Sequence, residues 1–257
     1  MECHPNEGMW NPALSDDRLQ GLTLIGEEMP LETRRCTFAG VMNKTLILVG
    51  LAFLAALFTI SLSKIWLPNM LVFFGLGSII TLILGLILCF KPEWANFLAP
   101  IYALAEGSTL GIVTFLFEEA IPGIGFQALS ITFCATFACL FVYRSGVIDS
   151  LIDARIAMVG LWVVMGVLIC NLIYQLLVPN MEIGLFGGGA LGFGLSLLLL
   201  AFYLYVLLVD FKTVSQAVRA GMPQIYEWYL GYSILLTLVL VYLEVLRILN
   251  YLSRRGR

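Results

Sequence analysis

Residues 184–210 read GLFGGGALGFGLSLLLLAFYLYVLLVD, and the one charged side chain in this stretch is its last residue, Asp210. A helix needs about 20 consecutive, mostly apolar residues to cross a bilayer. This stretch is longer than that, and it is also longer than the apolar run of an ordinary buried helix. It therefore predicts a membrane-spanning helix.

The composition of the whole chain points the same way. Of its 257 residues, 60% are hydrophobic and 12% are charged, whereas a typical soluble domain has about 25% charged residues. A soluble fold of this composition would lack the polar side chains to cover its surface. The net charge of −3 gives no basic field of the kind that attracts nucleic acid, so we expect a lipid bilayer as partner and no nucleic acid.

Six further stretches pass the same length test, and short connectors with Pro, Gly, Asn or charged residues separate them. The predicted spans are 45–63, 70–90, 97–117, 123–143, 156–178, 184–210 and 228–250. We therefore predict an all-α integral membrane protein, a seven-transmembrane helix bundle over residues 44–257. Residues 1–43 are polar and hold seven acidic residues, which predicts a mostly disordered tail.

Lysine and arginine are enriched in cytoplasmic loops, and their distribution here favours a cytoplasmic N-terminus. With that orientation, Lys64 is the only basic residue in the outer loops. The arginines at the C-terminal end fall outside and break the pattern. A re-entrant stretch would instead bring both ends inside, and this alternative stays open.

Each acidic residue inside a span costs at least about 2.5 kcal/mol to insert into the membrane. Such residues are therefore the candidates for a functional role. Glu106, Asp210 and Glu244 lie within predicted spans, and Glu227 lies at the inner mouth of the last one. Polar residues at helical spacing accompany them on single faces, namely Tyr102 and Thr109 in span three, Ser196 and Tyr203 in span six, and Ser233 and Thr237 in span seven. We expect these faces to turn toward one another and the acids to line a cation or proton path.

Each acid also has a structural interpretation, and these stay open beside the functional one. Glu244 can pair with Arg247 one turn away, and Glu227 can be a solvated loop residue. Asp210 can cap a helix end or lie among the lipid headgroups. Glu106 can be a protonated acid bonded to a neighbouring backbone group.

Several enzyme classes are excluded by residues the chain lacks. Its one histidine, His4, lies in the tail, which excludes haem ligation by paired histidines and serine–histidine proteolysis. No Walker loop is present. We therefore expect no enzyme, no cofactor and no metal site, with calcium or protons as transported or regulatory ions.

A set of longer segments resembles the Bax inhibitor-1 family, specifically its bacterial YccA-like branch. The resemblance runs from about Asn11 to the C-terminus. The carrying segments are GVMNKT at 40–45, KPEWANFLAPIYALAEG at 91–107, IPGIGFQALSITF at 121–133, YRSG at 143–146, VDF at 209–211 and EWYLGYSILLTLVLVYLEVLRIL at 227–249.

The resemblance implies a seven-helix fold in which the other helices surround the last one, in the bacterial inner membrane. It also implies a pH-sensitive calcium leak gated by two carboxylates on the last two helices. Asp210 matches the first of these. The second position falls near Thr237, so either another acid substitutes or this chain lacks that gating.

Two principal functions follow from these observations. One is a calcium or cation leak channel regulated by proton binding. The alternative is a regulator that binds another membrane protein, such as a quality-control protease, in which case the tail and the outer helix faces matter more than the acids. A proton-coupled transporter is a third possibility, although the sequence shows no convincing inverted repeat.

Overall fold

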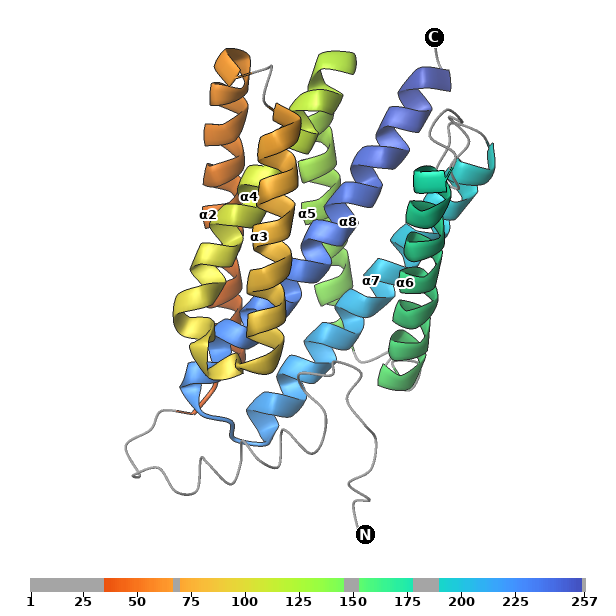
Figure 1. Ribbon diagram of the computed structural model, residues 1–257. Helices are drawn as coiled ribbons and strands as arrows, with labels where there is room; N and C mark the ends of the chain where they lie inside the picture. The colour runs from red at the N-terminus through yellow and green to blue at the C-terminus, as the bar shows by residue number, and fades with distance from the viewer. Residues whose placement is uncertain (1–34, 67–69, 146–152, 178–189, 256–257) are drawn as a thin grey trace.

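The computed structural model describes residues 35–66, 70–145, 153–177 and 190–255, so most of the predicted tail at 1–43 lies outside the described residues. The described chain is helical and forms one bundle (Figure 1). Its helices are α2 (Phe38–Trp66), α3 (Met70–Phe90), α4 (Ala95–Ala120), α5 (Ile124–Arg144), α6 (Ala154–Leu177), α7 (Ala190–Arg219) and α8 (Glu227–Arg255), with short 3-10 turns η3 (Pro92–Trp94) and η4 (Gln224–Tyr226).

The predicted seven-helix fold is confirmed, since each predicted span overlaps one of these helices over its described residues. By length and composition, six of them are able to cross a membrane over their described residues. The remaining helix, α6, coincides with the predicted span at 156–178, and its described side chains form the shorter apolar segment Arg155–Gly166.

Two glycines form the sharp turns before α5 and after α7. Gly123 has φ of 85° and precedes α5, while Gly221 has φ of 72° and follows α7. Residues with a side chain rarely adopt this left-handed conformation. The N–H of Met222 then donates to the carbonyl of Ala217, which closes the end of α7 as helix C-caps commonly do.

The last helix is central, as expected. Helix α8 packs against α2, α4, α5 and α7, and Leu230, Ile234 and Leu246 of α8 are fully buried. Helices α2 and α4 also pack closely, because a β-carbon at Gly107 would overlap the backbone of Ala52. Large apolar side chains are exposed around the outside of the bundle, which is the surface that hydrocarbon covers in a membrane protein.

Successive helices run in opposite directions, so α2 and α8 begin at the same end of the bundle and α8 ends at the other (Figure 1). The N–H of Cys36 donates to the carbonyl of Met222 at 2.7 Å and ties the two beginnings together. Seven basic residues lie at this end, and we therefore call it the basic end. They are Arg35, Lys44, Lys91, Arg144, Arg155, Lys212 and Arg219.

Candidate functional site

The predicted acidic ladder divides into separate contacts in the structure. Asp210 meets hydroxyl groups of α8, whereas Glu106 meets a tyrosine of its own helix. Glu244 is paired with an arginine, and Glu227 holds the beginning of α2. The polar faces of spans six and seven therefore come together at Asp210, and Glu106 lies apart from them.

Asp210 is a buried carboxylate between α7 and α8, with 3% of its surface exposed. Its Oδ1 accepts a hydrogen bond from Ser233 Oγ at 3.3 Å, and its Oδ2 accepts one from Thr237 Oγ1 at 2.5 Å. No basic side chain among the described residues forms a salt bridge with it. Because α7 continues to Arg219, the interpretation of Asp210 as a helix cap is wrong.

Thr237 lies near the place where the resemblance implies a second carboxylate. Its contact with Asp210 shows that this position does face the penultimate helix. The pair joining α7 to α8 is therefore an acid and a hydroxyl. A hydroxyl group both donates and accepts hydrogen bonds, so this pair can adjust to either protonation state of the acid.

Glu106 is half-buried on α4, and its Oε2 lies 3.4 Å from the hydroxyl of Tyr102. Thr109 turns back on the same helix and donates to the backbone carbonyl of Glu106 at 2.7 Å. The ring of Tyr102 packs edge-on against Tyr232 of α8, with centroids 4.9 Å apart. In the described structure Glu106 thus reaches the central helix through Tyr102.

Glu244 forms the ion pair with Arg247 that the spacing allows, with Oε1 2.7 Å from Nη1. The carboxylate is buried, and its Oε2 has no hydrogen-bond partner in the described part of the chain. Ser196 and Tyr203 of α7 are buried too. Tyr203 packs with Val241 and Val245 of α8. The polar face of α7 therefore meets the central helix at Tyr203 as well as at Asp210.

Glu227 is 1% exposed, so its interpretation as a solvated loop residue is wrong. It opens α8, and its Oε1 accepts hydrogen bonds from the N–H and the hydroxyl of Thr37, at 3.1 and 3.3 Å. Thr37 Oγ1 accepts from the N–H of Gly40 at 3.0 Å and so caps α2. A β-carbon at Gly40 would overlap the Glu227 carboxylate.

The sequence interpretation missed this capping pair, although one signal was available. A threonine directly before an apolar helical run is a common start signal, and Thr37 precedes α2 in this way. The neighbouring Cys36 is buried. Burial raises the pKa of its thiol to about 12, and the negative charge of Glu227 adds to this rise.

The described residues place no three His, Cys, Asp or Glu side chains where they could hold a metal ion. The acids instead take hydroxyl, amide and guanidinium partners.

No curated protein and no solved structure matches the chain. The family model described as Bax inhibitor 1 like matches residues 11–254, and this is a family of non-enzymatic membrane proteins. The match covers nearly the whole chain and includes every helix described above, so the chain belongs to the Bax inhibitor 1 like family.

Proposed function

We propose that this chain is a cation leak channel, with calcium as the principal ion, and that protonation of Asp210 regulates it. The observation that carries the proposal is the buried carboxylate of Asp210, held between α7 and α8 by hydroxyl donors and by no salt bridge within the described chain. Ionisable residues inside membrane helices usually serve ion or proton transfer.

The hydrogen bonds of Asp210 supply a physical switch. In the charged state, Ser233 and Thr237 both donate to the carboxylate and join α8 to α7. A protonated carboxyl group is itself a donor, so Thr237 no longer needs to donate to it. The Thr237 hydroxyl already lies 3.5 Å from the backbone carbonyl of Ser233, which offers it another acceptor. Protonation therefore weakens the link between the two helices.

The other acids have different parts in this proposal. Glu106 lies deep in α4 near the aromatic contact with α8, and it influences conduction more than gating. Glu244 is engaged by Arg247 and Glu227 by the beginning of α2, so both hold helices in place. Asp210 and Glu106 are thus the two members of the predicted path that retain an ion-handling role.

We propose further that the basic end faces the cytoplasm of a bacterial cell, in the inner membrane. The distribution of lysine and arginine supports this orientation, and the segments that resemble the YccA-like branch support the assignment to bacteria. Cysteines introduced at Ser145 and at Glu119, which are exposed at opposite ends, test the orientation. An impermeant thiol reagent added outside intact cells should label the second position and spare the first.

The direct test of conduction is calcium entry into dye-loaded liposomes that contain the purified protein, with empty liposomes as control. The proposal predicts entry above the empty liposomes that changes between pH 5 and pH 8. Folded protein without entry at any pH contradicts the channel and favours the alternative, a regulator that binds another membrane protein.

A further inference from the structure

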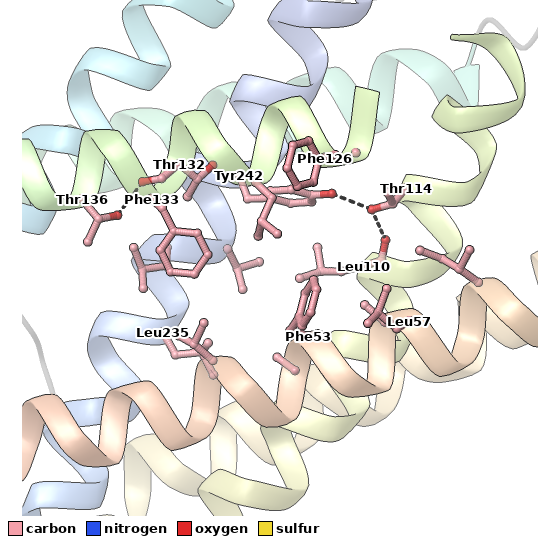
Figure 2. A pocket seen from close by; sticks show the side chains of 18 residues that line it. Phe53, Leu57, Leu110, Thr114, Phe126, Thr132, Phe133, Thr136, Leu235 and Tyr242 are labelled. Carbon is pink, nitrogen blue, oxygen red and sulfur yellow. Dashed lines mark hydrogen bonds between the residues drawn. The ribbon is translucent and has the colours of Figure 1, made fainter. Parts of the chain in front are cut away.

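A groove of about 290 Å³ opens on the side of the bundle between α2 and α5 (Figure 2). Helix α2 forms one wall from Val49 to Ile60, and α5 forms the other from Gly125 to Thr136. Side chains of α4 and α8 form the floor, namely Leu110, Thr114, Leu235, Leu238, Val239 and Tyr242.

The groove lining is apolar apart from hydroxyl groups that already have partners. Thr114 and Tyr242 share a hydrogen bond of 2.8 Å, while Thr132 and Thr136 donate to carbonyls of their own helix. The rim carries the exposed side chains of Phe53, Leu57 and Phe126. The groove is therefore continuous with the outer apolar surface and suits an apolar occupant.

The length of the groove suits an alkyl chain. Its α2 wall is about 16 Å long at 1.5 Å per residue, which is roughly half of the ~30 Å hydrocarbon core. One leaflet's acyl chain covers that length.

The two ends of the groove differ in charge. At one end the Glu118 carboxylate accepts hydrogen bonds from the N–H groups of Gly123 and Gly125, at 2.6 and 3.0 Å. Toward the basic end α2 closes onto α8, and there Lys44 Nζ lies 4.6 Å from the ring centroid of Trp228. An ammonium group beside an interfacial tryptophan favours an anionic headgroup, whereas the Glu118 end repels one.

We propose that this groove binds one acyl chain of an anionic bilayer phospholipid, whose headgroup lies beside Lys44 and Trp228. Thr237, which holds Asp210, is two residues from Leu235 and Val239 of the groove floor. Two residues correspond to about 200° around a helix, so the lipid site and the Asp210 cluster lie on opposite faces of α8. The proposal is thus independent of ion conduction.

Labelling from the lipid tests the acyl-chain site. The full chain is placed in phosphatidylcholine nanodiscs with a small fraction of phosphatidylglycerol that carries a photoreactive group in its acyl chain. After illumination, the labelled residues are mapped by mass spectrometry. The proposal predicts label concentrated on the groove walls. Label spread evenly over the groove and the outer face of α3 indicates ordinary boundary lipid and overturns the proposal.

Filling the groove should displace the lipid. Ala56→Phe adds a ring in the groove wall, and groove labelling should fall about tenfold, the equivalent of 1.4 kcal/mol. Leu129→Trp fills the space from the opposite wall and should act in the same way if Ala56→Phe fails to fold. The matched control is Ala138→Phe, an exposed position of α5 outside the groove. Equal labelling in a folded groove variant and in this control contradicts the proposal.

The proposed headgroup site beside Lys44 and Trp228 has its own matched control. Lys91 lies over Trp94 at the same 4.6 Å separation as Lys44 over Trp228, but away from the groove. Lys44→Gln should lower the labelling by phosphatidylglycerol about fivefold, the effect of roughly 1 kcal/mol per lysine at an anionic surface. Lys91→Gln should leave it unchanged. Equal labelling by photoreactive phosphatidylcholine and phosphatidylglycerol overturns the anionic headgroup.

Discussion

Thr237 Oγ1 on α8 donates a hydrogen bond of 2.5 Å to Oδ2 of Asp210 on α7, at a point where both residues are buried. This contact links the central helix α8 to α7 near the position where the family resemblance implies a second acid. The described link therefore consists of one carboxylate and a hydroxyl group that donates to it.

Thr237→Val tests the energy of this link, because valine keeps the shape and removes the hydroxyl. We expect a loss of about 1.5–3 kcal/mol, the range for hydrogen bonds to charged groups, measured by unfolding of the purified protein at pH 8. The control is Thr213→Val, since Thr213 is equally buried but donates to the carbonyl of Val209 in its own helix. If the loss is unchanged in an Asp210→Asn background, the two residues are not coupled.

The Glu244–Arg247 ion pair predicts that its two single substitutions lower stability by different amounts. The Arg247 side chain is 37% exposed and that of Glu244 only 5%. Arg247→Gln leaves a buried carboxylate without its partner and should destabilise the fold more than Glu244→Gln. Exchanging the two residues should restore part of the loss. Unfolding measurements check the order, and a large change of calcium flux in folded Glu244→Gln would place Glu244 on the ion path.

Gly40 and Gly50 on α2 form a matched pair for the contact with Glu227. A β-carbon at Gly40 overlaps the Glu227 carboxylate, whereas one at Gly50 meets nothing within 4 Å. Gly50→Ala should leave stability equal or raise it by up to about 1 kcal/mol, because alanine favours helix. Gly40→Ala should lower stability. Equal thermal midpoints for the two variants would show that Glu227 does not hold α2 as described.

The buried thiol of Cys36 predicts a dependence on alkaline pH. Its pKa rises on folding from 9.0 to about 12, so the folded state holds the thiol proton more tightly. This contribution to stability is complete below pH 9 and is lost as pH rises toward 12. The stability difference between the wild type and Cys36→Ala should shrink over that range. At pH 8 a maleimide should modify Cys36 more slowly than a cysteine introduced at the exposed Ser145, and equal rates would contradict the burial.

The sequence was sufficient to predict the helices, because each span is a long apolar run between turn residues. The helix ends were harder to predict, since the helices continue past the apolar core into polar residues. Helix α7 runs to Arg219 and not to Asp210. For this reason Asp210 lies inside the helix, where the sequence interpretation placed it at the end.

Periodicity also predicted the correct faces for Asp210, Ser233 and Thr237, because both helices carry apolar residues on their other sides. It did not show which neighbour each face meets. Glu106 contacts Tyr102 four residues away, on the face that the spacing predicts. Glu227, by contrast, bonds to Thr37, which is 190 residues away in the chain. Such contacts depend on how the helices pack, and a single sequence does not encode them in any local pattern.

The most direct measurement of the central claim is the pH profile of calcium entry for Asp210→Asn in dye-loaded liposomes. Asparagine keeps the volume of the side chain but cannot titrate, so the protein should fold. The control is Asp153→Asn, an exposed position at the start of α6. We predict that the control keeps the wild-type change between pH 5 and pH 8, while Asp210→Asn gives calcium entry that no longer changes with pH. A folded Asp210→Asn protein with the wild-type pH profile would contradict the account.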